Sequence, residues 1–195
     1  MLSKNEFSVL AALQQNPQSS QRQIATATGL SLGSVNAARK DLIERGLLDQ
    51  DMPTEAGLAE LEPHRVDNAI ILAAGLSSRF APISYEKPKG LLEVRGEVLI
   101  ERQIRQLHEV GITDITVVVG YKKEYFFYLE EKFGVTIAVN SEYATRNNHS
   151  SLMVVREKLA NTFVCSSDNY FVKNPFEPYV YKAYYAVTYV DGPTE

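Results

Sequence analysis

The residues best suited to chemistry lie in one loop near the middle of the chain. An apolar run, Ala69–Ala74, is typical of a buried strand, and Gly75 opens the loop that follows it. The loop continues with two small hydroxyl side chains and a cation, Ser77, Ser78 and Arg79. Small residues let backbone N–H groups approach phosphate oxygens, and the planar guanidinium of arginine adds further donors. We therefore predict that this loop binds phosphate groups.

A second cation is placed to act on the same phosphates. Lys89 follows Arg79 along the chain, and Pro82 and Pro88 stiffen the segment between them. In an open α/β sheet, ligands bind beyond the carboxyl ends of the strands, where this loop begins. The residue order is neither GxxxxGK[ST] nor GxGxxG, so the loop is neither a P-loop nor a dinucleotide-binding motif. A tight strand-to-helix turn with a solvated arginine is the alternative that the loop by itself leaves open.

A carboxylate suited to metal binding follows a later apolar run. Asp168 comes just after Thr162–Ser166, which is predicted to be a strand. A carboxylate beyond a strand end faces the crevice at that edge of the sheet, and Mg²⁺ prefers hard oxygen ligands of this kind. Ser-Asp-Asn clusters also form turns, so a role for Asp168 in capping the turn before Tyr170 stays open.

A parallel sheet is the structure expected to position these residues. From Asn68 onward, apolar runs alternate with stretches of helical periodicity. The predicted strands are Ala69–Ala74, Ile115–Val119, Val135–Val139 and Thr162–Ser166, and the predicted helices are Leu99–Val110, Glu124–Phe133 and Ser150–Leu159. Continuous apolar strands separated by helices predict an α/β, Rossmann-like fold, in which a mostly parallel sheet is covered on both faces.

The first third of the chain has a different pattern, that of a small helical domain. Three helices are expected: one that ends at Asn16-Pro17, one from about Ser20 to Thr28, and one that begins at Ser31 or Ser34 and ends at Gly46. Leu47–Asp51 is expected to form a short wing strand, and Thr54 to cap a last short helix. We place the domains at residues 1–65 and 68–195, with Glu62–Arg65 as the linker.

The segment QRQIATATGLSLGSVNAARKDLIERGLL resembles bacterial winged-helix regulators. The resemblance implies a third helix that faces DNA, with Ser34, Asn36, Arg39 and Lys40 as candidate contacts. However, residues 1–65 contain six Lys or Arg and eight Asp or Glu, and this net charge of −2 is poor for binding phosphate. DNA binding and docking to another protein therefore both stay open.

The segment AIILAAGLSSRFAPISYEKPKGLLEV, residues 69–94, is similar to the signature of the nucleoside-triphosphate transferase family. This family includes sugar-1-phosphate nucleotidyltransferases and phosphocholine cytidylyltransferases. The resemblance continues through LIERQIRQLHEVGITDITVVVGYKKE, NSEYATRNNHSSLMVV and FVCSSDNYF. The Asn-Asn-x-x-Ser-Leu element from Asn147 to Leu152, and Ser-Asp-Asn-Tyr after a strand, look most like bacterial CTP:phosphocholine cytidylyltransferases.

The resemblance implies a Mg²⁺-dependent reaction in which a phosphate oxygen of phosphocholine attacks the α-phosphorus of CTP and pyrophosphate leaves. It implies that the base and ribose contact Leu72, Ala73, Ala74, Gly75, Asn147, Asn148 and Ser150. Ser77, Ser78 and Arg79 would bind the triphosphate, and Asp168 would hold Mg²⁺. Arg79 and Lys89 would be the catalytic cations. Positioning and charge neutralisation are enough for this chemistry.

The same resemblance leaves two alternative functions open and limits the activity expected of this chain. The alternatives are a sugar- or polyol-phosphate nucleotidyltransferase and a nucleotide-sensing transcription regulator without turnover. The family's domain is usually longer than Asn68–Glu195, so we expect a C-terminally incomplete domain with little turnover. A second metal carboxylate and much of the acceptor pocket would then lie outside it. The Tyr-rich stretch Tyr179–Tyr189 is expected to form either a cation–π cage for choline or strand residues, with an edge strand near Tyr184–Val190.

The composition of the chain limits the class of protein and the cellular location that we expect. The 195 residues are 45% hydrophobic and 23% charged, which is ordinary for a soluble globular protein. The longest apolar run is far below the roughly 20 residues that a membrane span needs. The N-terminal residues MLSKNEF lack the apolar core of a secretory signal. Cys165 is the single cysteine, so an intramolecular disulfide and a cysteine-rich zinc site are excluded and a cytoplasmic location is expected. The oligomeric state stays open.

Overall fold

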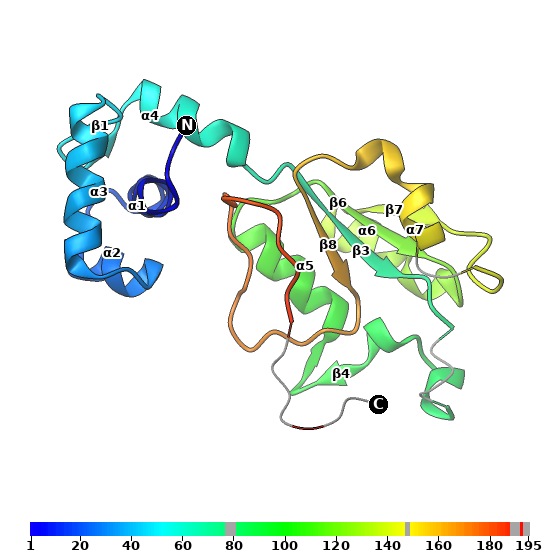
Figure 1. Cartoon of the computed structure of the whole chain (residues 1–195). Helices are drawn as coiled ribbons and strands as arrows, with labels where there is room; N and C mark the ends of the chain where they lie inside the picture. Colours follow the sequence, from blue (N-terminus) through cyan, green and yellow to red (C-terminus); the bar gives the residue numbers. More distant parts are fainter. Residues whose placement is uncertain (77–80, 147–148, 188–191, 193–195) are drawn as a thin grey trace. The chain divides into compact units, whose positions relative to one another are not determined.

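The chain folds into two compact units. The computed structural model describes residues 1–76, 81–146, 149–187 and 192 (Figure 1). The first unit, called here the helical unit, comprises Met1–Arg65 and Tyr179–Glu195. The second, called here the sheet unit, comprises Val66–Pro178. In the described part of the chain, no helix has the length and apolar character needed to cross a membrane.

The helical unit contains the expected helices and a short wing. Its elements are α1 (Lys4–Gln15), α2 (Gln21–Thr28), α3 (Leu32–Glu44), β1 (Leu48–Asp49), β2 (Met52–Pro53), α4 (Glu55–Leu61) and the 3₁₀ turn η1 (Glu62–His64). The strands β1 and β2 pair antiparallel, so the wing is a hairpin of two very short strands rather than the single strand expected over Leu47–Asp51. Gln50 adopts a positive φ of 57° in the turn that reverses the chain between them.

Small hydroxyl residues begin each of the four α-helices of this unit. The side chains of Ser3, Ser20, Ser31 and Thr54 each accept a hydrogen bond from a backbone N–H in the first turn of the helix that follows. Such caps satisfy donors that have no partner inside the helix. Ser31, and not Ser34, therefore begins α3, because its side chain accepts from the backbone N–H of Ser34.

A segment from the far end of the chain completes the core of the helical unit. Tyr179 and Tyr181 pack against the cluster of buried residues from α1, α2, α3 and α4. The backbone N–H of Val180 donates to the carbonyl of His64 at 2.8 Å. The Tyr181 ring lies 5.4 Å from the Phe7 ring, and its hydroxyl donates to the Leu2 carbonyl. The expectation of a choline cage or sheet strand is therefore wrong for Tyr179 and Tyr181, because their rings are used in this core.

The sheet unit alternates strands and helices, as predicted. Its elements are β3 (Asn68–Ala73), η3 (Ile83–Tyr85), η4 (Lys89–Leu91), β4 (Glu93–Val94), β5 (Glu97–Val98), α5 (Leu99–Glu109), β6 (Ile115–Val119), η5 (Lys123–Phe126), α6 (Tyr128–Phe133), β7 (Thr136–Val139), α7 (His149–Val154), η6 (Arg156–Lys158) and β8 (Thr162–Ser166). The helix expected over Ser150–Leu159 is shorter and ends before Val155, whose side chain is buried against Ile70 and Val118 of the sheet.

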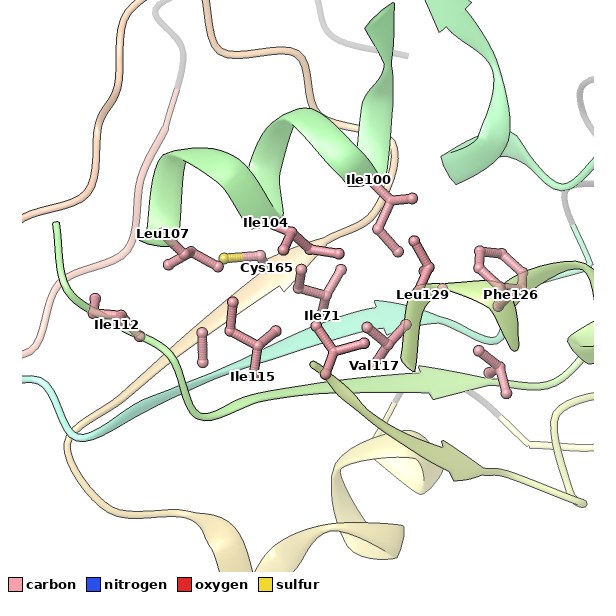
Figure 2. Packing of buried hydrophobic residues seen from close by; sticks show 14 of the residues in the cluster. Ile71, Ile100, Ile104, Leu107, Ile112, Ile115, Val117, Phe126, Leu129 and Cys165 are labelled. Atoms are coloured by element: carbon pink, nitrogen blue, oxygen red, sulfur yellow. The ribbon is translucent and has the colours of Figure 1, made fainter. Parts of the chain in front are cut away.

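The central sheet has four strands in the order β7-β6-β3-β8, and every neighbouring pair is parallel. Alternate residues of β3 face opposite sides of this sheet. Ile71 packs with Ile104 of α5 and Leu129 of α6 on one face (Figure 2). Ile70 packs on the other face, where Leu152 of α7 contributes. The predicted α/β class, with a parallel sheet covered on both faces, is thus confirmed.

The described residues 182–187 contain no part of the edge strand expected near Tyr184–Val190. Residues 184–187 have no regular secondary structure, and residues 188–190 lie outside the described residues. Tyr185 is 90% exposed and Val187 is 83% exposed. Without a neighbouring strand to pair with its backbone, the apolar pattern of this stretch is not enough to form a strand.

Candidate functional site

The strand order predicts a ligand crevice at the carboxyl ends of β3 and β8. From β3 the chain moves to β6 and then β7 on one side, and it returns to the other side of β3 as β8. The order of strands along the chain therefore reverses between β3 and β8. In open α/β sheets, ligands bind at the carboxyl ends of the strands at such a reversal of strand order.

The backbone predicted to contact the nucleotide borders this crevice. Leu72 is in β3, and its carbonyl accepts a hydrogen bond from Ser167 N–H at 3.1 Å. The carbonyl of Ala74 accepts from Tyr121 N–H at 3.4 Å, on the side of β6. Ala73 and Ala74 are buried, whereas Gly75 is exposed where the loop begins. Their contact with a nucleotide stays a prediction.

Two of the predicted functional side chains come together at the end of β8. The Lys89 ammonium lies 3.6 Å from Oδ2 of Asp168, although 79 residues separate them in sequence. The Ser166 hydroxyl donates to Oδ1 of Asp168 at 2.5 Å, which orients the carboxylate. The Asp168 side chain is 38% exposed, so a ligand has access to it. The proposed cation for phosphate and the proposed metal ligand are therefore neighbours.

Gly90 explains how Lys89 reaches this position. A Cβ at Gly90 would lie 2.8 Å from both Cβ and Oγ of Ser167. Real Cβ atoms do not make such contacts, so only glycine lets η4 pack this closely against the loop after β8. The glycine therefore determines that Lys89, which precedes it, lies beside Asp168.

The helix α5 holds the loop after β8 through side chains that sequence reasoning did not identify. Gln103 is fully buried, and its Nε2 donates to the carbonyls of Ser166 at 3.0 Å and Asn169 at 2.9 Å. Gln106, one turn later, donates to the Phe171 carbonyl at 3.1 Å. Two glutamines at adjacent turns on the apolar face of a helix are the sequence feature that indicates such a role.

Asn140 performs a comparable function at the end of β7. Its side chain is buried, and Nδ2 donates to the hydroxyls of Ser150 and Ser151, both at 3.0 Å. Its backbone N–H donates to the Val119 carbonyl at 2.8 Å, which keeps Asn140 at the edge of the sheet. Asn140 thus fixes the first turn of α7.

The residues predicted to contact the base and the triphosphate are only partly described. Ser150 is buried, and its hydroxyl accepts from Asn140, so the structure shows it in a supporting contact. Its contact with a nucleotide stays a prediction. Five further candidates lie outside the described residues: Ser77, Ser78, Arg79, Asn147 and Asn148.

The chemistry of the site is that of charge and position rather than of a side-chain nucleophile. Cys165 lies in β8, next to Ser166, and burial raises the pKa of its thiol to about 12. The thiol is therefore protonated at neutral pH and unreactive. Among the described residues, no group of three or more His, Cys, Asp or Glu is placed to hold a metal ion.

Asp168 by itself suits Mg²⁺ better than a transition metal. Mg²⁺ is commonly held by one or two carboxylates, with substrate phosphates and water as its other ligands. A partly exposed carboxylate, oriented by Ser166 and located beside Lys89 of the predicted phosphate-binding loop, has this donor chemistry. The position of a second carboxylate ligand stays an expectation.

The candidate DNA contacts on α3 are mostly engaged within the helical unit. Arg39 forms an ion pair with Asp51 of the wing, and the Lys40 ammonium lies 3.6 Å from Glu44. The Ser34 hydroxyl lies 2.9 Å from the hydroxyl of Ser31. Asn36 is exposed. Acidic partners beside both cations reduce the positive potential that phosphate binding requires.

Comparison with known proteins identifies both units. Residues 69–190 match the MobA-like NTP transferase domain, and the chain belongs to this family. Residues 2–49 match the winged helix-turn-helix DNA-binding model. The resemblance to nucleoside-triphosphate transferases, with a winged helix in front, is thereby confirmed.

The relatives include two cytidylyltransferases with different acceptors. The chain is 52% identical over 108 residues to choline-phosphate cytidylyltransferase of Streptococcus pneumoniae, covering 55% of this chain and 47% of that protein. It is 45% identical over 104 residues to 2-aminoethylphosphonate cytidylyltransferase of Lancefieldella rimae, covering 52% and 42%. The solved structure of the S. pneumoniae CTP:phosphocholine cytidylyltransferase matches with a TM-score of 0.57 and 50% identity, covering 58% and 50%. The chain thus spans about half the length of these relatives.

Proposed function

We propose that the chain provides the nucleotide-binding site of a Mg²⁺-dependent cytidylyltransferase, with phosphocholine as the favoured acceptor. The observation that carries this proposal is the pairing of Lys89 with Asp168 at the carboxyl ends of β3 and β8. A candidate cation for phosphate and a candidate carboxylate for Mg²⁺ therefore meet where ligands commonly bind in open α/β sheets.

The reaction needs little covalent chemistry from the protein. A phosphate oxygen of the acceptor forms a bond to the α-phosphorus of CTP, and the bond from that phosphorus to pyrophosphate breaks. Lys89 offsets negative charge that develops on the phosphate oxygens, and the backbone after β3 orients the nucleotide. Asp168, oriented by Ser166, would hold Mg²⁺, which when bound neutralises phosphate charge.

The choice of CTP rests on the relatives. Two of them are cytidylyltransferases by name, one for choline phosphate and one for 2-aminoethylphosphonate. Both acceptors are small molecules that combine a cationic nitrogen group with a phosphate or phosphonate group. We infer that phosphocholine is the acceptor because the identity to the choline-phosphate relative is higher, 52% against 45%. The aminophosphonate is the alternative.

Nucleotide binding is the primary test, because the chain spans about half the length of its cytidylyltransferase relatives. Calorimetric titration with CTP, UTP, ATP and GTP, each with and without Mg²⁺, should show the tightest binding for CTP with Mg²⁺. Arg79→Ala is expected to weaken that binding. No binding of any nucleotide, or a clear preference for a purine nucleotide, would contradict a cytidylyltransferase. A preference for UTP would favour a sugar-phosphate transferase.

A nucleotide-sensing transcription regulator is the second candidate, and the match of residues 2–49 to a DNA-binding model favours it. In that case nucleotide binding would change DNA affinity without turnover. Two measurements distinguish the candidates. The first is the DNA affinity of the chain with and without CTP and Mg²⁺, and the second is the release of pyrophosphate when the acceptor is added. Pyrophosphate release supports the enzyme, and a nucleotide-dependent change in DNA affinity without release supports the regulator.

A further inference from the structure

Lys122 connects the end of β6 to the loop that follows β3. Its ammonium donates to the Tyr85 carbonyl at 2.5 Å and to the Glu86 carbonyl at 3.2 Å. These carbonyls lie at the end of the 3₁₀ turn η3, in the second half of the predicted phosphate-binding loop. Carbonyls at the end of a helical turn lack partners within the turn, and lysine is a suitable donor to them.

The backbone around Lys122 holds its side chain in this position. Lys122 adopts a left-handed conformation, with φ of 51° and ψ of 42°. The preceding Tyr121 N–H donates to the Ala74 carbonyl at the end of β3, and the Lys122 carbonyl accepts from Tyr125 N–H at 3.1 Å. A Cβ at Gly120 would lie 2.6 Å from Tyr143, so only glycine permits this close path of the chain.

Two aromatic rings complete the surroundings of the ammonium. Nζ of Lys122 lies 5.7 Å from the centre of the Tyr121 ring and 5.4 Å from that of the Tyr125 ring. A cation within about 6 Å of a ring is attracted to its face. The carbonyl oxygens and the aromatic rings therefore both attract the ammonium at this point.

We propose that Lys122 is a positioning residue that orders residues 81–88 and thereby increases the affinity for the nucleotide triphosphate. This inference rests on the proposed function. The loop is attached to the sheet at Ala74 and again at Lys89, and a loop of this length loses much conformational entropy when it is ordered. Contact with Lys122 offsets part of that cost before the nucleotide binds. The apparent affinity rises with the fraction of molecules that already have the binding-competent loop.

The test compares Lys122→Met with Lys123→Met in the full 195-residue chain. Methionine keeps the unbranched stem and removes the charged donor. Lys123 is the exposed neighbour, so its replacement controls for the loss of one positive charge. Lys122→Arg restores charge and donors. The first readout is hydrogen exchange at the amides of residues 85–87 without nucleotide, and the second is the Kd for CTP with Mg²⁺.

Lys122→Met should accelerate exchange at residues 85–87 and raise the Kd about three- to tenfold, as expected if the competent fraction falls. Lys123→Met should change neither readout, and Lys122→Arg should recover most of both. Unchanged exchange, or faster exchange throughout the sheet unit, would overturn the positioning role. Faster exchange with an unchanged Kd would overturn its connection to the nucleotide. If the parent chain binds no nucleotide, the proposed function fails, whereas exchange still decides whether Lys122 orders the loop.

Discussion

The cations predicted to bind phosphate or DNA form ion pairs in different places in the two units, and these places determine what the pairs indicate. In the sheet unit, Lys89 and Asp168 come from loops after two different strands and meet where the strand order predicts a ligand crevice. In the helical unit, Arg39 pairs with the wing that follows its own helix, and Lys40 pairs with Glu44 one turn later. A pair that the fold assembles at a crevice indicates function, whereas local pairs mainly neutralise a surface.

Each unit also contains a buried glutamate that links separate elements. Burial by itself raises the pKa of Glu6, but hydrogen bonds from Ser3 and Arg45 outweigh it and hold the pKa below its ordinary value. Burial acts in the same direction on Glu101, and hydrogen bonds from Lys132 and Tyr128 again lower its pKa. These carboxylates join α1 to the end of α3, and α5 to α6. They therefore contribute to stability rather than to a site.

The largest expected effect is a loss of nucleotide affinity when Lys89 or Asp168 is replaced. Lys89→Ala and Asp168→Ala should each weaken the binding of CTP with Mg²⁺ by about 1.5–3 kcal/mol, because charge-assisted contacts are lost. Asp168→Ala should also remove the benefit of Mg²⁺. Calorimetric titration measures both, with Arg39→Ala in the helical unit as the control. If both variants bind like the parent, the crevice is not the nucleotide site.

The next largest expected effect is on the stability of the helical unit, to which Tyr179 and Tyr181 contribute. Tyr181→Ala should destabilise that unit by about 1–3 kcal/mol, since it removes ring contacts and apolar burial. Chemical denaturation, followed by hydrogen exchange in α1, measures the change. Tyr185→Ala is the matched control, because Tyr185 is 90% exposed. Equal effects of the two variants would show that Tyr181 does not belong to this core. Nucleotide binding by the sheet unit should stay unchanged.

Glu101→Gln should lower the stability of the sheet unit by a smaller amount, and this loss should depend on pH. A carboxylate whose pKa is lower in the folded state stabilises the fold above its unfolded pKa, and this contribution is lost as pH falls through the folded pKa. The variant should lose about 1–2 kcal/mol of stability at neutral pH. The difference should shrink in acid, where the parent's Glu101 is protonated too. Denaturation at several pH values, with the exposed Glu131→Gln as control, tests this, and a pH-independent difference would contradict it.

The smallest expected effect is on DNA binding by the surface of α3. The parent chain should bind DNA weakly, and Asp51→Asn should improve non-specific binding by less than about 1 kcal/mol, because it releases Arg39 from an ion pair. The salt dependence should steepen by about one unit of slope, corresponding to one additional phosphate contact. A salt-titrated binding assay on the full chain decides this. Submicromolar non-specific binding by the parent at physiological salt would show that the pairing does not suppress DNA contact.

The local pattern of the sequence determined the elements of this protein. The apolar runs predicted β3, β6, β7 and β8. The reason is clearest for β3 and β6, because a parallel strand buried on both faces needs apolar residues at successive positions. Hydroxyl residues such as Ser20 and Thr54 predicted where helices begin, because capping acts over only three residues. Asp168 and the loop after β3 could be predicted as functional because their residue types suit phosphate and metal binding and because they follow strands.

The tertiary structure alone decided which of these residues meet. The distance between Lys89 and Asp168 depends on the order β7-β6-β3-β8 and on the close packing at Gly90, neither of which is encoded in a local repeat. The roles of Gln103 and Lys122 were not identified from the sequence, because their partners are carbonyls that any residue type offers. Tyr181 was assigned to the wrong environment for a related reason. Its apolar ring predicts burial, but only long-range packing selects the core in which the ring is buried.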